Sequence, residues 1–257
     1  MKNLKLSVVI PAYNEETNIR LGALDKVSRY LEKQSYPWEA IIVDDGGSDG
    51  TPELLNAFAK ANRGLPAGRQ GFSIIHNPHQ GKAATVITGM LAARGEIVLF
   101  TDLDQATPIT ELANVLPWFE KGFDVVIGSR NSTRAGAPFT RRIMARGFMM
   151  LRGIILGLRG IVDTQCGFKA FRKEVAEDIF GRLKLYGTRH TVSGSMVTAG
   201  FDLEMLFLAK KQGYKIKEVP VEWHYVETRR VSPIIDSIQG FSDILKIRIN
   251  AWRGLYG

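Results

Sequence analysis

The sequence contains one cysteine, no long apolar run and no internal repeat. Cys166 has no second cysteine to pair with, so an internal disulfide is excluded and a reducing cytosol is the expected compartment. Residues 1–5 precede only a short apolar run, too short for the core of a signal peptide. The most apolar stretch, 143–158, is interrupted by Arg146, Arg152 and several glycines, so it is not expected to span a membrane. These shortages point away from secreted, disulfide-bonded and membrane-spanning proteins.

The two signs of charge are unequally represented. Among 257 residues, Lys and Arg outnumber Asp and Glu by 34 to 26, which gives a formal net charge of +8. Such a surplus suggests an anionic partner, which could be nucleic acid, a membrane surface or a phosphorylated substrate. The basic residues are dispersed and match no nucleic-acid recognition motif, so nucleic acid is not the expected partner. With 45% hydrophobic residues, the chain can bury one large core.

Short apolar runs alternate with longer amphipathic segments along the chain. Strands are expected at 6–10, 40–43, 72–76, 97–100, 124–127, within 163–171 and at 216–223. Helices are expected at 15–33, from 52, at 83–94, 109–121 and 141–159, from 173, and at 201–211 and 233–252. Residues 62–71 and 184–198 are expected to be loops, the first an exposed insertion. This alternation predicts right-handed crossovers and an α/β fold with a mostly parallel central sheet flanked by helices.

The segment IVLFTDLDQAT at 97–107 contains the acidic end of a buried strand. Asp102 and Asp104 are two positions apart where the strand becomes a loop, so both carboxylates can face one small volume. Open α/β sheets bind ligands at this carboxyl edge. Two carboxylates this close repel each other unless a cation lies between them, which predicts a divalent ion carrying a substrate diphosphate. Alternatively, Asp102 caps the next helix and Asp104 is solvated.

The neighbouring strand ends carry groups that suit a nucleotide sugar. The first strand is followed at the same edge by Pro11, Ala12, Tyr13 and Glu15. Asp45 follows the second strand and can accept a hydrogen bond from a base N–H. Lys82 precedes a helix and can meet phosphate, although the upstream glycine of a P-loop is absent. Phosphate could also be held by Arg130, Arg141 and Arg142. Each residue alone is more often solvated, but together they mark one sheet edge.

Six segments in this order resemble the family 2 glycosyltransferases of the GT-A fold. They are SVVIPAYNE at 7–15, VDDGGSDGT at 43–51, GK at 81–82, TDLD at 101–104, GSR at 128–130 and DTQCGFK at 163–169. The similarity is strongest to dolichyl-phosphate β-glucosyltransferases and the related mannose synthases. It implies inverting transfer of a hexose from a nucleotide sugar to a polyprenyl phosphate at the cytoplasmic membrane face, with Mg²⁺ or Mn²⁺ as the cofactor.

The resemblance also implies a role for each matching position. The nucleotide-sugar-binding set would be Pro11, Ala12, Tyr13, Glu15, Asp45, Lys82, Asp102, Leu103 and Asp104. The metal ligands would be Asp102 and Asp104. The acceptor phosphate would be held by Arg130, Arg141 and Arg142. The catalytic set would be Asp102, Asp104, Arg130, Asp163 and Gln165. Asp202 and Glu204 match an acidic motif that would contact sugar or acceptor; alternatively, they stabilise a helix start.

Two departures from the family pattern bear on the donor site. Mannose synthases of this group usually carry DADLQ, whose Gln can join the metal, whereas here Gln105 directly follows Asp104 and Ala106 takes the next place. The TQCGF segment also resembles the glucosyl branch, which favours UDP-glucose over GDP-mannose. Gly47 is an extra small residue in VDDGGS, and we expect it to shift the loop around the base.

The second half of the chain contains two amphipathic segments. Arg alternates with Met, Leu, Ile and Phe at 141–159, and apolar residues recur at helical spacing over 233–252. Both patterns suit either packing on the core or docking on anionic lipid headgroups. We expect a catalytic domain at 1–230, with a nucleotide-sugar half to about 130 and an acceptor half beyond it. A C-terminal amphipathic helix would occupy 231–257 and pack on the domain or the membrane.

Several functions remain open on the sequence alone. They are glucosyl transfer to a polyprenyl phosphate, mannosyl transfer from GDP-mannose, transfer to a non-lipid acceptor, and nucleotide-sugar binding without turnover. The intact pair of carboxylates disfavours the last. A lipid phosphate is already anionic near neutral pH, so the transfer would require positioning and charge neutralisation rather than a strong general base.

Overall fold

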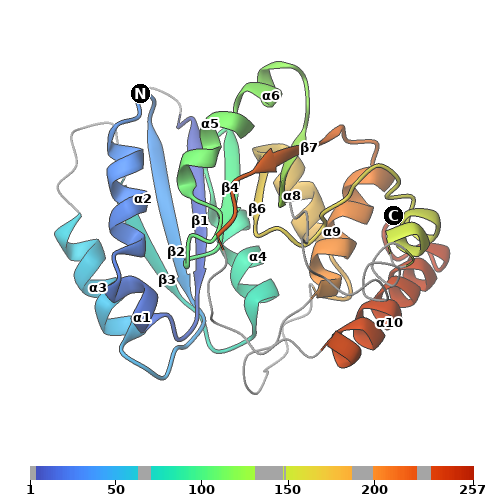
Figure 1. The fold of residues 1–257 in the computed structure, drawn as a ribbon, viewed down its shortest axis with the longest axis horizontal. Helices are drawn as coiled ribbons and strands as arrows, with labels where there is room; N and C mark the ends of the chain where they lie inside the picture. Colours follow the sequence, from blue (N-terminus) through green and yellow to red (C-terminus); the bar gives the residue numbers. More distant parts are fainter. Residues whose placement is uncertain (1–3, 63–70, 131–146, 148, 187–198, 225–232) are drawn as a thin grey trace.

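A twisted seven-stranded sheet crosses the middle of the molecule, with helices on both faces (Figure 1). The computed structural model describes residues 4–62, 71–130, 147, 149–186, 199–224 and 233–257. Within these ranges, the strands are β1 (Leu6–Ala12), β2 (Trp38–Asp44), β3 (Gly71–His76), β4 (Ile97–Thr101), β5 (Val125–Arg130), β6 (Phe168–Arg172) and β7 (Ile216–Val221). Their order across the sheet is β3-β2-β1-β4-β6-β5-β7. The α/β class is therefore confirmed.

Among the described strands, β6 alone runs against the others. β1 pairs in parallel with β2 and β4, β2 with β3, and β5 with β7, whereas β6 is antiparallel to both β4 and β5. The prediction of a mostly parallel sheet is thus confirmed. Because β6 is reversed, its first residue, Phe168, pairs with the last residue of β4, Thr101. The segment that precedes β6 therefore reaches the same edge as the carboxyl ends of the parallel strands.

The helices follow the expected order, but two of them are broken. They are α1 (Glu16–Arg20), α2 (Ala23–Glu32), α3 (Thr51–Ala61), α4 (Lys82–Ala92), the 3₁₀ turn η1 (Ile109–Glu111), α5 (Leu112–Val115), α6 (Pro117–Glu120), α8 (Lys173–Arg182), α9 (Ala199–Lys211) and α10 (Pro233–Trp252). A single helix at 15–33 was wrong, because Gly22 takes a left-handed conformation with φ of +79°. A single helix at 109–121 was also wrong; Pro117, which lacks a backbone N–H, begins a new turn there.

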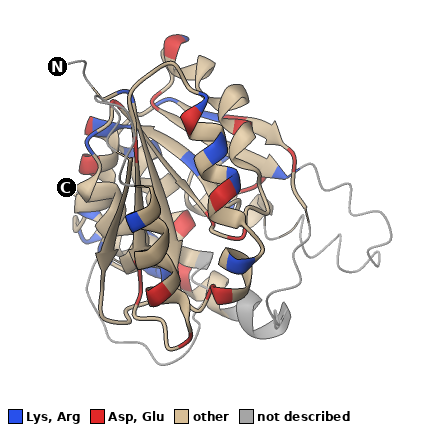
Figure 2. Ribbon diagram, turned by 90° about the vertical axis from the view of Figure 1, so that its left-hand side faces the viewer, with Lys and Arg blue, Asp and Glu red and all other residues tan. Residues whose placement is uncertain are grey.

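Apolar side chains form a separate layer on each face of the sheet. Successive residues of β1 point to opposite faces, so Val9 packs in one layer while Val8 and Ile10 pack in the other. The strands carry little charge, and Lys, Arg, Asp and Glu are concentrated on the helices and loops (Figure 2). α10 packs against α9 and adds Ile244 and Ile247 to the layer that contains Val9. The proposed division of the chain near 130 and 230 remains a prediction.

Parts of several predicted segments lie outside the described residues. These include most of the loops expected at 62–71 and 184–198, and the stretch with Arg141 and Arg142. Of the helix expected at 141–159, residues 149–155 are helical. Among the residues that the structure describes, no helix is both long enough and apolar enough to cross a membrane.

Candidate active site

Tyr13 follows β1 at the carboxyl edge and stacks on a histidine that the sequence did not single out. The rings of Tyr13 and His79 are 4.1 Å apart and inclined by 10°. His79 Nδ1 lies 2.8 Å from Asp45 Oδ2, and the Asp45 carboxylate also accepts the N–H groups of Gln80 and Gly81 at 2.9 and 2.8 Å. Asp45 is buried and so shapes the loop beneath Tyr13. Its contact with a nucleotide base remains a prediction, because this carboxylate already binds the chain.

The other residues that end β1 are also fixed by the fold. Pro11 and Ala12 lie within β1 and are buried against their neighbours in β2. The backbone N–H of Glu15 donates to Thr51 Oγ1 at 2.7 Å, and the Glu15 carboxylate accepts the Asn18 amide at 2.5 Å. The start of α3 is thereby held to the loop after β1. Binding of the nucleoside at this corner remains a prediction from the sequence.

Asp102 lies directly after β4, held between a lysine and a glycine. Lys82, the first residue of α4, donates Nζ to Asp102 Oδ1 at 2.5 Å. On the other side, a Cβ at position 167 would collide with the Asp102 carboxylate, so a larger residue there would have to displace it. Leu103 is buried beneath the loop. The carboxylate is therefore paired with a cation rather than capping the next helix, and the segment before β6 lies against it.

Gln105 fixes the turn that carries Asp104. Its φ is +54°, a left-handed conformation that is uncommon for a residue other than glycine. Its side-chain amide donates to the carbonyl of Asp102 at 2.9 Å and accepts the N–H of Ile109 at 3.0 Å. Asp104 Oδ1 accepts the N–H of Ala106 at 3.0 Å. The side-chain amide of Gln105 thus stabilises the loop, and its hydrogen bonds go to the backbone of the chain instead of to an ion.

The acidic loop offers two carboxylates to a metal. Among the described residues, no group of three or more His, Cys, Asp and Glu side chains could hold an ion. Asp102 and Asp104 alone make a partial ligand set, which suits ions that are bound by one or two carboxylates together with substrate phosphates. The ammonium of Lys82 at Asp102 shows that this carboxylate accommodates a positive charge. The residues present therefore fit a divalent cation that arrives with a diphosphate.

Arg130, the last residue of β5, forms a two-point ion pair with Asp163. Its Nε and Nη2 donate to the two carboxylate oxygens at 2.6 and 2.8 Å, and its backbone N–H donates at 3.0 Å. Burial opposes the charge of Asp163, but the hydrogen bonds and the charge of Arg130 outweigh it, so the pKa of Asp163 lies below its ordinary value. Gln165 donates its backbone N–H to Asp163, and its side chain is exposed. The predicted neighbours are therefore together.

A buried arginine braces the loop that presents Asp163. Arg152 donates to Thr164 Oγ1 at 2.7 Å and to the carbonyl of Ile161 at 2.8 Å. Glu218 on β7 accepts the N–H of Asp163 at 2.6 Å. Burial lowers the pKa of Arg152, although nearby carboxylates oppose that shift. Arg152 is therefore not available for docking on lipid headgroups, because it is buried and its guanidinium binds groups of the chain itself.

A fully buried lysine on β6 holds the first acid of the GFDLE segment. Lys169 donates Nζ to Asp202 Oδ1 at 2.6 Å and to the carbonyl of Cys166 at 2.5 Å. The same nitrogen lies 5.3 Å from the ring centre of Phe100. The side chain of Asp202 is 18% exposed. It is therefore an anchored carboxylate close to the acidic loop and to Arg130.

Glu204, the second acid of that segment, faces the interior. Its carboxylate accepts the N–H groups of Lys184 and Leu185 at 2.9 and 2.7 Å and the hydroxyl of Tyr256 at 2.6 Å. Its relative exposure is 0%. The expected contact of Glu204 with sugar or acceptor does not agree with this position. The residue instead ties the chain after α8 and the C-terminal segment to α9.

The carboxyl edge brings most of the predicted site together. The residues that meet along it are Tyr13, Asp45, Lys82, Asp102, Arg130 and Asp163. Arg141 and Arg142 lie outside the described residues. His79, Arg152 and Lys169 were not predicted as site residues. His79 lies just before the GK motif, and Lys169 is the last residue of the DTQCGFK motif. For Lys169, the available signal was a charged residue within an expected buried strand.

Comparison with known proteins identifies the family of this chain. The sequence model of glycosyl transferase family 2 matches residues 7–180. The chain belongs to this family. This glycosyltransferase is 33% identical over 267 residues to the dolichyl-phosphate β-glucosyltransferase of Saccharomyces cerevisiae, covering 98% of this chain and 76% of the yeast protein. The human dolichyl-phosphate β-glucosyltransferase is 30% identical, with 97% and 78% covered.

Solved glycosyltransferase structures share the fold. The Pyrobaculum calidifontis mannosyltransferase PcManGT, in complex with GDP-Man and Mn²⁺, superposes with a TM-score of 0.59 at 20% identity over 96% of this chain and 65% of that one. The Mycobacterium tuberculosis glucosyl-3-phosphoglycerate synthase, in complex with Mn²⁺, UDP and its product, gives 0.58 at 19% identity over 95% and 80%. The GT-A fold expected from the sequence is therefore confirmed.

Proposed function

We propose that this glycosyltransferase moves glucose from UDP-glucose to a dolichyl-type polyprenyl phosphate, with inversion at the anomeric carbon. The observation that supports it most is the meeting of two charge sites at one edge. Asp102 in the acidic loop lies against Gly167. Four residues before Gly167, Asp163 accepts hydrogen bonds from Arg130. A diphosphate donor and a phosphate acceptor need such sites side by side. Enzymes that match this chain along nearly its whole length include dolichyl-phosphate β-glucosyltransferases.

The donor would lie across the ends of β1, β2 and β4. Tyr13, supported by His79, offers a ring face to the base, while the ammonium of Lys82 can donate to a phosphate oxygen. Asp102 and Asp104 would hold a divalent cation, in keeping with the Mn²⁺ in two structurally similar transferases. Such an ion neutralises the charge that develops on the leaving nucleoside diphosphate.

The acceptor would approach from the side of β5. Arg130, fixed by Asp163, can orient an incoming lipid phosphate toward the anomeric carbon. The phosphate is its own nucleophile, so no group of the chain has to remove a proton. Asp202, held as an ion pair by Lys169, would accept a hydrogen bond from a hexose hydroxyl. Arg141 and Arg142 complete the proposed acceptor set.

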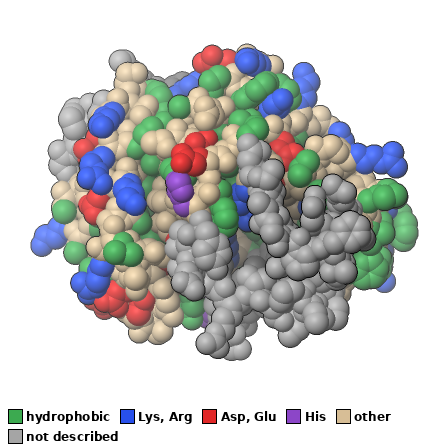
Figure 3. All heavy atoms as spheres, viewed as in Figure 1, with side chains coloured by type: hydrophobic (Ala, Val, Ile, Leu, Met, Phe, Trp, Pro, Cys, Tyr) green, Lys and Arg blue, Asp and Glu red, His purple; other side chains and the backbone are tan. Residues whose placement is uncertain are grey.

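A lipid acceptor implies a docking face on the membrane, and α10 offers one. Phe241, Leu245, Ile249 and Trp252 recur at helical spacing, and each is at least 40% exposed. Arg248 lies 5.2 Å from the ring of Trp252, which places a cation beside the apolar stripe. Exposed hydrophobic side chains gather at the right-hand edge of the molecule, next to the C-terminus (Figure 3). We infer that the enzyme binds peripherally to the cytoplasmic face of the membrane, where anionic headgroups would attract cations such as Arg248.

A transfer assay with competing donors tests the proposal. The enzyme is offered UDP-glucose and GDP-mannose side by side with a short polyprenyl phosphate, in Mg²⁺, Mn²⁺ or chelator. We expect glucosyl product that disappears with chelator. Asp104→Asn should abolish transfer, whereas Asp25→Asn, at an exposed position on α2, should leave it unchanged. Product from GDP-mannose alone would overturn the donor, and no product from either would overturn the lipid transferase.

A further inference from the structure

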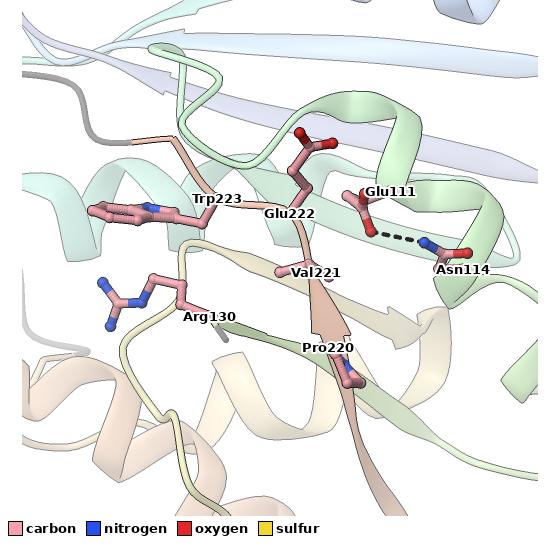
Figure 4. A pocket seen from close by; sticks show the side chains of 7 residues that line it. All are labelled: Glu111, Asn114, Arg130, Pro220, Val221, Glu222 and Trp223. Carbon is pink, nitrogen blue, oxygen red and sulfur yellow. Dashed lines mark hydrogen bonds between the residues drawn. The ribbon is translucent and has the colours of Figure 1, made fainter. Parts of the chain in front are cut away.

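A pocket of about 370 Å³ opens where β5 and β7 end, beside the proposed acceptor arginine. Its walls come from Arg130, from the run 220–223 at the end of β7, and from Glu111 and Asn114 at η1 and α5 (Figure 4). Among the lining residues that the structure describes, Arg130 is the only cation, and Glu111 and Glu222 are both acids. A phosphate that enters is therefore attracted at the guanidinium and repelled elsewhere. The orientation of Arg130 decides how an anion is received.

Two different contacts restrain the guanidinium of Arg130. Asp163 binds its Nε and Nη2 edge with two hydrogen bonds of 2.6 and 2.8 Å. The Trp223 ring centre lies 5.8 Å from Cζ, within the range of a cation–π interaction, and Figure 4 shows the indole beside the guanidinium. The two hydrogen bonds from Asp163 hold the guanidinium against sliding within its plane. They still permit the guanidinium to rotate about the line that joins Nε and Nη2. A ring over one face removes that rotation.

The backbone next to Trp223 is attached to the acidic loop. The N–H of His224 donates to the carbonyl of Ala106 at 2.8 Å, two residues after Asp104. Below it, a Cβ at position 128 would lie 3.1 Å from both Cys166 Sγ and Val221 Cγ2, so the end of β7 packs closely against the motif before β6. Trp223 therefore lies on a short segment that connects the acidic loop to the neighbourhood of Arg130. The residue itself is 39% exposed.

We propose that Trp223 is a positioning residue for Arg130. Together with Asp163, it fixes the plane of the guanidinium so that the Nη1 edge faces an incoming acceptor phosphate. This inference rests on the proposed function, because it assumes that Arg130 receives the acceptor. Trp223 acts through Arg130 and needs no contact with the reacting atoms.

Substitution of Trp223 tests this role against a matched tryptophan. Trp118 on α6 makes the same type of contact with Lys121 and Lys217, at 4.3 and 4.1 Å, but lines no part of the pocket. Trp223→Ala should raise the KM for polyprenyl phosphate by about 2- to 30-fold, the range of one cation–π contact, and leave the KM for UDP-glucose unchanged. Trp223→Phe should recover most of the loss, and Trp118→Ala should alter neither KM.

A double-mutant cycle then shows whether Trp223 acts through the arginine. In an Arg130→Ala background, Trp223→Ala should cause no further rise in the acceptor KM. An equal rise in both backgrounds would overturn the proposal. A rise in the KM for UDP-glucose instead of the acceptor would also overturn it.

A readout without substrates separates this inference from the proposed function. The Nε–H signal of Arg130 in nitrogen-15 NMR spectra, assigned by its loss in Arg130→Lys, reports how firmly the guanidinium is held. It should shift and broaden in Trp223→Ala and stay in place in Trp223→Phe and Trp118→Ala. An unchanged signal in Trp223→Ala would sink the positioning role even if transfer fell. If the wild type glucosylates no lipid phosphate, the proposed function fails, and the signal still decides whether Trp223 orients Arg130.

Discussion

The ion pair between Lys82 and Asp102 gives the donor site a built-in competition. The ammonium lies 2.5 Å from the oxygen that would bind a divalent cation. Lys82 is also proposed to donate a hydrogen bond to a phosphate oxygen of the nucleotide. Lys82→Met should therefore tighten Mn²⁺ binding in the absence of nucleotide. It should weaken UDP binding in the presence of Mn²⁺ by roughly tenfold or more, the loss expected for one charge-assisted hydrogen bond.

Isothermal titration of Mn²⁺, and then of UDP, measures both effects. Lys60→Met, at an exposed position near the end of α3, is the matched control and should alter neither affinity. If Lys82→Met weakened Mn²⁺ binding as well, the two cations would not be competing for Asp102.

The close contact between Gly167 and Asp102 predicts that a larger residue at position 167 impairs catalysis. An added methyl group would lie 2.1 Å from Asp102 Oδ2 and must displace the carboxylate. Gly167→Ala should abolish metal-dependent turnover. Gly181→Ala, in α8 with no atom within 4 Å of the new methyl, should keep activity and gain up to about 1 kcal/mol of helix stability. Activity and thermal unfolding of both variants check this, and a fully active Gly167→Ala enzyme would contradict it.

The lowered pKa of Asp163 links the acceptor site to acid stability. A carboxyl group with a depressed folded pKa stabilises the native state above its unfolded pKa of about 3.9, and this contribution disappears as the pH falls through the folded value. Asp163→Asn should therefore be least stable relative to wild type near neutral pH, with the difference shrinking below about pH 4. Urea unfolding between pH 3 and 7 measures it. A difference that is independent of pH would show that the charge of Asp163 contributes nothing.

At the scale of elements, the segment that braces Asp163 should behave as part of the acceptor site. Arg152→Met keeps much of the side-chain volume but removes the hydrogen bonds to Thr164 and Ile161. We expect a loss of roughly 2 kcal/mol or more of stability, because a buried hydroxyl and partly buried carbonyls lose a charged donor, together with a higher KM for the acceptor. Arg159→Met, at an exposed arginine of the same segment, is the control. Loss of stability with an unchanged acceptor KM would confine Arg152 to a structural role.

The strands were the elements that sequence predicted best. β1, β2 and β4 each contain a short apolar run with a polar stop, and burial on both faces makes such runs continuous. The helices at 15–33 and 109–121 were overextended, because an amphipathic pattern continues through Gly22 and Pro117 although the backbone does not. Periodicity also could not show that Arg152 faces inward. Its partners are carbonyls of a turn 9 and 10 residues further along the chain, whose position depends on β6 and β7.

The candidate site was predictable as a set of strand ends but not as a set of contacts. That Asp102 and Arg130 lie at one edge follows from a parallel sheet, whereas Asp163 reaches that edge because β6 is antiparallel, which the parallel pattern did not predict. The burial of Glu204 and the internal hydrogen bonds of Asp45 do not follow, because they depend on which loops fold back over the edge. A carboxylate in a motif has the same sequence signature whether it binds substrate or the chain.

At the scale of the whole molecule, the apolar stripe of α10 should control membrane binding. The enzyme should float with vesicles that contain anionic lipid at low salt and partly dissociate at high salt, because surface charges are screened. Leu245→Glu should reduce flotation strongly. Leu91→Glu, on α4 at a similar exposure of 45% against 41%, should not. Equal flotation of both variants would place the docking surface elsewhere.

The reversal of β6 has a consequence for how this enzyme can diversify. The proposed acceptor motif reaches the edge from the amino end of β6, so we expect the connection from β5 to β6 to serve the acceptor, while the proposed donor residues lie on earlier segments. Substitutions in this connection should then change the acceptor preference and leave the proposed donor residues in place. A chimera that exchanges this connection between relatives should inherit the acceptor preference of one parent and the nucleotide preference of the other.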